Sequence, residues 1–193
     1  AKQGAVWTAR ADAYVGKAQA TPAEAAANYD KGFDAFKKAL EIAPDDAGLY
    51  NNYALALAKD KKIDEARTNL AKAAQLDPPG AGKYYYNLGA LLVNGGQNSA
   101  AEEEFRKATE LDPTYADAQY QLGMALSAKA DVDAKTGKVT PAPGTVEALQ
   151  KYLELKPDGA NAQSAKEMIA ALGGTVATTY GTSKPKPGAA KKK

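Results

Sequence analysis

The 193-residue sequence contains no cysteine and no histidine. Without cysteine, the chain cannot form disulfides, present a thiolate nucleophile or hold zinc or an iron–sulfur cluster through sulfur. Without histidine, it lacks the side chain that most often serves as a general base or metal ligand. It also has no run of about 18 apolar residues, so the sequence predicts no membrane span. A hydrolase triad built on histidine is therefore excluded. We also expect no cofactor, no metal and no enzymatic activity, with an enzyme that uses carboxylates as a minor alternative.

Phenylalanine is scarce, with three in the chain, whereas alanine occurs 43 times. Because alanine is the best helix former, this composition favours helices. The net charge is only +2 and uneven, since residues 175–193 hold five lysines and no acid, while the rest carries 20 bases and 23 acids. The final three lysines, Lys191-Lys192-Lys193, could touch nucleic acid or an acidic membrane surface, but interleaved aromatic residues and arginine are missing there. We therefore expect no nucleic-acid partner.

One pattern recurs along the chain, a helical stripe that ends in proline at positions 44, 78, 113 and 157. Successive prolines are 34, 35 and 44 residues apart. Before each proline, apolar and small residues follow steps of three and four, which keep to one face of a helix. A second stripe precedes each of these, and in the third copy it is Tyr85, Leu88, Gly89 and Leu92. The chain therefore repeats a unit of two helices.

These stripes resemble the tetratricopeptide repeat family, whose pattern is aromatic-x-x-Leu-Gly-x-x-Tyr, then Ala-x-x-x-Phe-x-x-Ala, then proline, over about 34 residues. The resemblance covers residues 4–157 in four copies, and the second and third copies match closely. The first copy departs at Arg10 and Gly32, and the fourth at Gln119 and Thr145. The resemblance implies an all-α fold, a right-handed α-solenoid of antiparallel helix pairs. Neighbouring repeats must stack, because one repeat cannot bury its apolar face alone.

We expect the solenoid at residues 1–174 and a separate basic, low-complexity tail at residues 175–193. The expected elements of the solenoid are repeats at residues 4–45, 46–79, 80–114 and 115–158 and a capping helix at residues 159–172. Thr21 and Glu24 have the spacing of a capping box ahead of a long second helix in the first repeat. Residues 131–144 are an insertion in the fourth repeat, and its composition predicts a small β-hairpin.

The resemblance also implies a binding surface, because the first helix of each pair lines the concave face in this family. The residues implied for a peptide-binding groove are Asn51, Asn52, Leu55, Tyr86, Asn87, Ala90, Asn94, Tyr120, Gln121 and Met124. Tyrosine, amide and methionine side chains combine apolar contact area with hydrogen bonds, which suits peptide binding. The alternative is a soluble inner face without a ligand.

Some members of the family grip a C-terminal carboxylate with lysine, arginine and asparagine on these same helices. Asn52 and Lys83 fit two of those positions, and the remaining three are Thr8, Asp12 and Asn87. An aspartate in that place would repel a carboxylate, so we do not expect the carboxylate clamp here.

Two acidic clusters have plain structural interpretations. Asp131-x-Asp133 begins like a calcium loop, but Ala142 stands where that loop needs its glutamate, so we expect a polar turn. Glu102-Glu103-Glu104 precedes Phe105 on a helix, where adjacent residues point about 100° apart and cannot share one metal. We expect these three glutamates to form a solvated helix face.

Together these patterns predict a non-catalytic protein–protein interaction module that binds a peptide or protein segment in the concave groove. The alternative is a structural protein that assembles with further copies of itself, because head-to-tail contacts that do not close give filaments. The tail residues expected to contact a neighbouring copy are Val176, Thr178, Tyr180, Lys184 and Lys186. Because the chain begins at Ala1 rather than methionine, we expect a mature exported protein, periplasmic or extracellular, with a cytoplasmic protein as the alternative.

Overall fold

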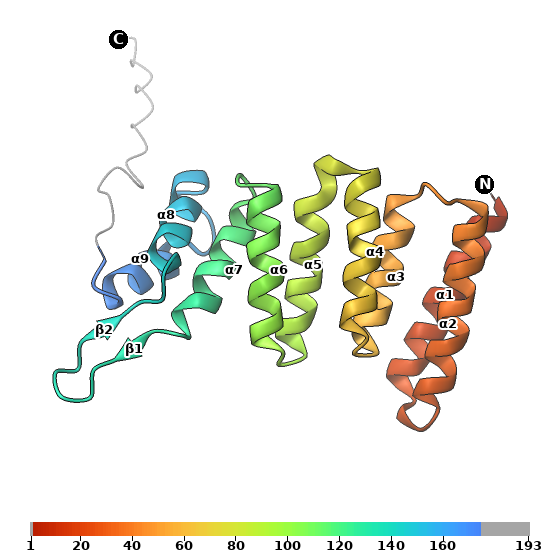
Figure 1. The fold of residues 1–193 in the computed structure, drawn as a ribbon, viewed down its shortest axis with the longest axis horizontal. Coiled ribbons are helices and arrows are strands. Elements are labelled where there is room, and N and C mark those ends of the chain that lie inside the picture. Colours follow the sequence, from red (N-terminus) through yellow and green to blue (C-terminus); the bar gives the residue numbers. More distant parts are fainter. Residues whose placement is uncertain (1, 175–193) are drawn as a thin grey trace, which may run out of the picture. The chain divides into compact units, whose positions relative to one another are not determined.

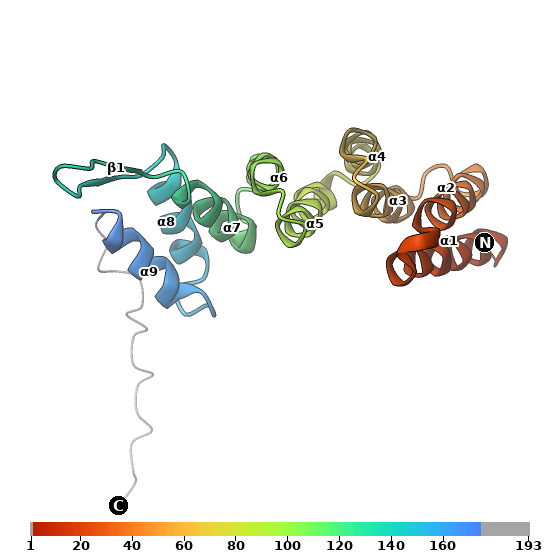
Figure 2. The ribbon, with the colours of Figure 1, turned by 90° about the horizontal axis from the view of Figure 1, so that it is seen from below.

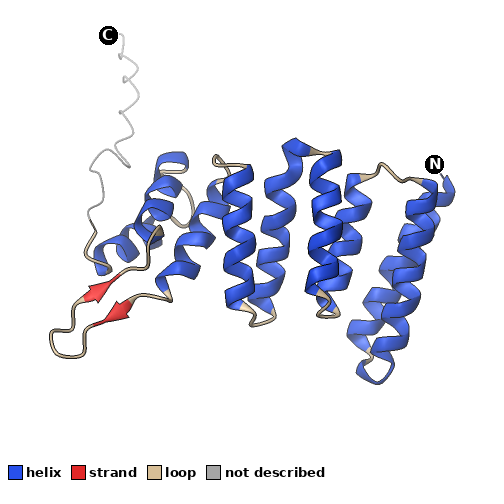
Figure 3. Ribbon diagram, viewed as in Figure 1, coloured by secondary structure: helices blue, strands red, loops and turns tan. Residues whose placement is uncertain are grey.

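The computed structural model describes residues 2–174, and this part of the chain is built almost entirely of helices (Figures 1 and 3). It contains nine α-helices, two short 3-10 helices and one two-stranded hairpin. The all-α fold of antiparallel helix pairs is thus confirmed, and the small hairpin is a minor addition. The predicted tail residues from Val176 to Lys186 lie outside the described residues.

The chain divides into two compact units, Ala1–Ala118 and Gln119–Lys193. The division falls inside the first helix of the predicted fourth repeat. The expected single solenoid over residues 1–174 and its four repeat boundaries stay predictions.

Unit 1 consists of three antiparallel helix pairs. Its helices are α1 (Lys2–Ala20), α2 (Ala25–Ile42), α3 (Ala47–Lys59), α4 (Ile63–Leu76), α5 (Ala81–Asn94) and α6 (Asn98–Leu111), with short 3-10 helices at Pro22–Glu24 and Pro78–Gly80. Within each pair the two helices pack together, and α2 also contacts α3, as α4 contacts α5. Figure 2 shows α1, α3 and α5 on one side of the unit and α2, α4 and α6 on the other.

The core of unit 1 is formed by the two stripes that the sequence predicts. Phe36, Leu70 and Phe105 from the second helices are at most 1% exposed, as are Leu57 and Leu88 from the first helices. These side chains recur at the interfaces between successive helices, so burial continues from one pair to the next. This continuity is the expected way in which a repeat protein stabilises units that are too small to fold alone.

Small residues mark the closest helix approaches. A Cβ atom added to Gly89 of α5 would stand 2.6 Å from the Phe105 ring of α6. In unit 2, a Cβ atom on Gly123 would stand 2.6 Å from Leu149. Both distances are shorter than ordinary carbon contacts, so only glycine permits this separation of the two helices.

Aspartates begin two of the structured turns. Asp46 accepts a hydrogen bond from the Leu49 backbone N–H at 2.9 Å and caps α3. Asp77 accepts from the Tyr84 hydroxyl at 2.6 Å, and burial together with this carboxylate raises the pKa of Tyr84 to about 12. The capping box expected at Thr21 is not formed, because the Thr21 side chain makes no capping hydrogen bond and a 3-10 turn begins at Pro22 instead.

The expectation of a solvated face for the three successive glutamates is wrong for two of them. Glu102 and Glu104 are 8% and 2% exposed, and only Glu103 is exposed. Arg67 of α4 donates from Nε to Glu104 and from Nη2 to Glu103, each at 2.5 Å. Burial raises the pKa of the Glu104 carboxyl, and the Arg67 guanidinium counteracts that rise. The ion pair thus joins the second helices of two neighbouring repeats.

Unit 2 contains the remaining elements. They are α7 (Ala116–Ser127) from Gln119 onward, the hairpin strands Asp131–Val132 (β1) and Val139–Thr140 (β2), α8 (Thr145–Leu155) and α9 (Ala162–Ala171). The strands pair antiparallel, so the predicted hairpin is confirmed, and α9 lies within the range expected for the capping helix. Asp133 accepts hydrogen bonds from two backbone N–H groups in the hairpin turn, which lowers the pKa of its carboxyl.

Candidate functional site

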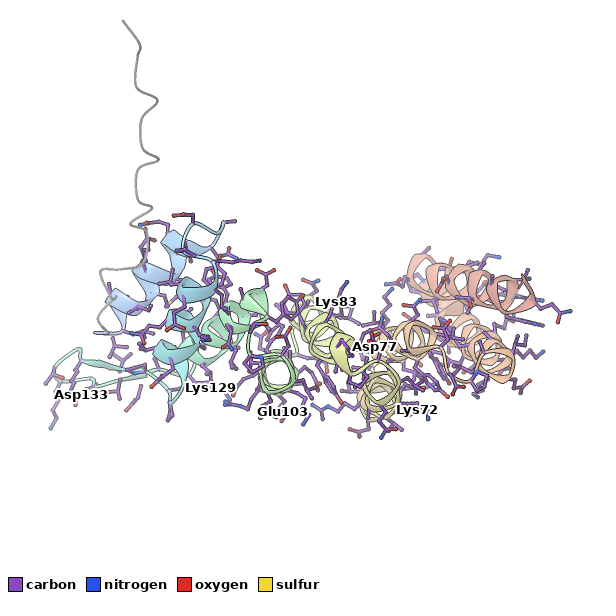
Figure 4. All side chains as sticks on the ribbon, turned by 90° about the horizontal axis from the view of Figure 1, so that it is seen from above. Lys72, Asp77, Lys83, Glu103, Lys129 and Asp133 are labelled. Atoms are coloured by element: carbon purple, nitrogen blue, oxygen red, sulfur yellow. The ribbon has the colours of Figure 1, made fainter. Side chains whose placement is uncertain are left out.

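We define the first-helix face as the solvent-facing side of α1, α3 and α5 in unit 1. Figure 4 shows Lys83 of α5 on this side, whereas Lys72 and Glu103 lie on the opposite side. Of the residues predicted for the groove, the seven in unit 1 all lie on α3 or α5. Asn52 and Asn94 are exposed, Asn51 is buried, and the half-buried ones are Leu55, Tyr86, Asn87 and Ala90.

Asn51 is buried and donates a hydrogen bond to its neighbour Asn52, so little of its side chain is open to a ligand. It is 9% exposed, and its Nδ2 donates to Asn52 Oδ1 at 3.3 Å. Its own Oδ1 is enclosed and has no hydrogen-bond partner among the described residues. A buried amide oxygen without a partner carries a desolvation cost of about 1–3 kcal/mol. Asn52 is therefore the better placed of the two to meet a ligand.

Tyr86 is only partly available for a ligand, because its ring takes part in packing. The ring centroid lies 5.8 Å from that of Phe105 and 4.9 Å from that of Tyr115. Burial, followed by the neighbouring Tyr86 and nearby aspartates, raises the pKa of Tyr115 to about 12. Any binding role of Tyr86 thus uses the edge that the aromatic cluster leaves uncovered.

A hollow of the first-helix face lies between α1 and α3, outside the groove that the sequence predicts. Its volume is about 680 Å³, within the range of ligand pockets. It is lined by Gly4, Ala5, Thr8, Ala9 and Asp12 of α1, by Ile42, Ala43 and Asp46, and by Leu49 of α3. The space is open because the α1 residues that line it include Gly4, Ala5 and Ala9, which have small or no side chains. These positions are not among the stripe residues of the first repeat, so the repeat pattern does not predict the hollow.

The hollow combines apolar walls with acidic groups. Partial burial raises the pKa of the Asp12 carboxyl, and the Lys59 cation partly offsets that effect. Asp46 has one oxygen engaged in capping α3. Lys59 itself donates to Gln19 Oε1 at 3.3 Å, in a smaller hollow of about 290 Å³ at the C-terminal ends of α1, α3 and α5. The larger hollow therefore favours an apolar group with a cation beside it.

The three predicted groove residues of α7, Tyr120, Gln121 and Met124, lie in unit 2 and are half-buried. Tyr120 is engaged on two sides, since its ring centroid is 5.2 Å from that of Tyr152 and its hydroxyl is 3.1 Å from Ser164 Oγ. Tyr86 and Tyr120 both pack on neighbouring helices, which the sequence did not show. Their role as ligand contacts stays a prediction.

In residues 2–174 no three aspartates or glutamates are grouped so that they could hold a metal ion. None of the described helices has both the length and the apolar character needed to cross a membrane.

Comparisons with known proteins point to one family. The family models described as "Tetratricopeptide repeat" and "TPR repeat" match residues 35–68 and residues 91–129. Small glutamine-rich tetratricopeptide repeat-containing protein 2 of Mycosarcoma maydis is 32% identical over 98 residues, 51% of this chain and 28% of that protein. The peroxisomal targeting signal receptor of Candida albicans is 41% identical over 75 residues, 39% of this chain and 12% of that protein.

The chain thus covers less than a third of either relative's length. Among solved structures, a crystal structure of MamA protein matches with a TM-score of 0.51 at 20% identity, covering 89% of this chain and 85% of the other. This likeness shows the fold alone. Because the helix pairs and the stripe residues coincide with both family models at residues 35–68 and 91–129, the chain contains tetratricopeptide repeats in these segments.

Proposed function

We propose that this chain is a non-catalytic protein-interaction module that binds an extended segment of a partner protein on the first-helix face of unit 1. The observation that carries the proposal is the hollow of about 680 Å³ between α1 and α3. Most of the residues that line it are small or apolar, and Asp12 and Asp46 are the acids among them. Asn52 and Lys83, both exposed, offer hydrogen-bond donors farther along the same face.

The hollow specifies the chemistry of the bound segment. An apolar side chain of the partner fits against Ala5, Ala9 and Leu49, where burying it removes apolar surface from water. A lysine or arginine next to that side chain would face Asp12. Amide side chains such as Asn52 can pair with the backbone N–H and C=O groups of an extended chain. The proposed ligand is therefore a segment with an apolar residue beside a basic one.

The names of similar proteins support a binding role. One relative is named a targeting signal receptor, and another, 31% identical over 98 residues, is named the Hsp70-Hsp90 organizing protein of Triticum aestivum. The first name is that of a receptor for a targeting signal, and the second is that of a protein that organises Hsp70 and Hsp90. For this chain, binding of a partner protein is our proposal.

The test is to fill the hollow with a larger side chain. Ala9 is exposed and lines the hollow, so Ala9→Phe should occupy that space without disturbing the helix core. A phage library of linear random peptides selected on the wild-type protein should yield sequences with an apolar residue beside lysine or arginine. Calorimetric titration of those synthetic peptides should show a loss of affinity of about tenfold or more in Ala9→Phe, as expected when a central anchor is displaced.

The matched control is Ala13→Phe, since Ala13 is also an exposed alanine of α1 but does not line the hollow. This variant should bind the selected peptides like the wild type. If the library yields no enriched sequence, or if Ala9→Phe binds the enriched peptides as well as Ala13→Phe does, the hollow is not the binding site and the proposal is wrong.

A further inference from the structure

A second candidate surface lies on α1 and α2, at one end of unit 1 (Figure 1). Cationic groups lie over the faces of two aromatic rings. The Arg10 guanidinium is 5.3 Å from the centroid of Trp7 and 5.7 Å from that of Tyr14. The Lys38 ammonium is 4.6 Å from Trp7, and those of Lys17 and Lys31 are 5.8 and 5.9 Å from Tyr14. We call these six residues the Trp7 patch.

Arg10 is exposed at a repeat position that is buried in the next two repeats. The equivalent residues of the next two repeats are Tyr53 and Leu88, which are buried. Tyr53 packs on Phe33 and Phe36 of α2, the second helix of the preceding pair. The first pair has an exposed arginine where the later pairs have an apolar packing residue.

The residues of α2 in the patch lie on the side of that helix away from α3. At about 100° per residue, Lys31 and Lys38 point roughly opposite to Phe33 and Phe36, which contact α3. Lys31, Lys38 and Arg10 are exposed, and the rings of Trp7 and Tyr14 are half-buried. The patch is thus a surface with both charge and aromatic area open to a partner.

The Trp7 patch is positively charged, whereas the rest of unit 1 has a net negative charge. Residues 1–118 contain 14 lysines and arginines and 17 acids, so their net charge would be −7 without the four cations of the patch. One acid, Asp34, stands among the residues that line a hollow of about 180 Å³ in the patch, and it is exposed and 3.7 Å from Lys37. The Arg10 guanidinium, which donates toward the Tyr14 hydroxyl, lowers the pKa of that phenol. These groups make the hollow attractive to carboxylates.

We propose that the Trp7 patch binds an acidic segment of a partner protein, on a surface separate from the first-helix hollow. Carboxylates of the segment pair with Arg10, Lys31 and Lys38, and its aliphatic parts lie against the exposed ring surfaces. The fit is to a short acidic peptide because the cations are confined to one helix pair. A longer polyanion such as single-stranded nucleic acid would extend over the net negative remainder of the unit.

Trp7 is the only tryptophan of the chain and therefore reports on this surface alone. Three probes are titrated into the full chain at low salt: a peptide rich in aspartate and glutamate, the same peptide with asparagine and glutamine, and an oligothymidine strand. The acidic peptide should change the Trp7 fluorescence with saturation, and its affinity should fall as salt rises, because exposed charges are screened within about 10 Å at 0.1 M. The amide peptide should give no saturable change.

The decisive variants reverse charge inside and outside the patch. Replacing Arg10, Lys31 and Lys38 by glutamate should weaken the acidic peptide about tenfold or more. The same three-charge change at Lys61, Lys72 and Lys107, which are exposed and lie outside the patch, should leave most of the affinity. Equal losses in both variants, equal binding of the amide peptide, or binding of oligothymidine but not of the peptide would each overturn the proposal. Far-UV circular dichroism confirms that both variants are folded.

Discussion

Replacing Arg67 with methionine is expected to lower the free energy of unfolding by about 3 kcal/mol. The side chain of Glu104 is 3% exposed, and Arg67 is its charged partner. Removing one member of a buried ion pair costs about 3–5 kcal/mol because an uncompensated charge stays behind. We expect the lower end of that range, since the Arg67 side chain is 35% exposed and water screens part of the interaction. Urea denaturation followed by circular dichroism measures the loss.

This loss should depend on pH in a defined direction. Burial raises the pKa of Glu104 above its ordinary value of 4.5, and Arg67 opposes the rise, so Arg67→Met should raise the pKa further. A group whose pKa is raised in the folded state lowers stability above its ordinary pKa, and this loss is complete once the pH exceeds the folded-state pKa. The stability difference between wild type and variant should therefore be largest near pH 7 and shrink as pH falls toward 4.

The double variant Arg67→Met/Glu104→Gln should recover much of the loss at neutral pH, because it no longer leaves a buried charge. A surface pair provides the control: Lys151 is 2.9 Å from Glu154, and both side chains are more than 40% exposed. Lys151→Met should cost at most about 1 kcal/mol. A deficit in Arg67→Met that is no larger than in Lys151→Met, or that does not vary with pH, would show that Glu104 does not depend on Arg67.

Gly89→Leu is expected to destabilise unit 1 by about 1–3 kcal/mol or more, the usual cost of overpacking. A Cβ atom at this position would already lie 2.6 Å from one atom of the Phe105 ring and 2.8 Å from another. Phe105 is fully buried, so its ring cannot swing into solvent, and we expect α5 and α6 to separate. The melting temperature measured by circular dichroism should fall accordingly.

Gly16→Ala is the matched control, because Gly16 is also a helical glycine but a Cβ atom there would meet nothing within 4 Å. Alanine at this exposed position of α1 should stabilise the helix by about 0.5–1 kcal/mol. The two glycines should thus respond in opposite directions. An unchanged melting temperature in Gly89→Leu would mean that the helix register described for α5 is wrong.

The sequence predicted the helices of the chain well, since their apolar periodicity reflects local geometry. The stripes through Leu57, Leu70 and Leu88 correspond to buried positions, and the prolines at 44, 78, 113 and 157 follow helix ends. The valine-bearing arms around Gly137 form the predicted hairpin. Each of these features depends on residues within one or two turns, where propensity and periodicity act directly. Self-association, the compartment and the tail contacts stay predictions.

The sequence by itself thus determined the helix pairs, their apolar faces and the family. Only the tertiary structure decided which polar residues are buried and where the surface is hollow. Glu104 becomes buried because α4 brings Arg67 to it from 37 residues away, and no local pattern encodes that distance. Tyr86 packs on Tyr115, and the hollow at Ala9 opens between α1 and α3, for the same reason. Contacts between helices depend on how side chains from separate segments fill shared space, which only the folded chain defines.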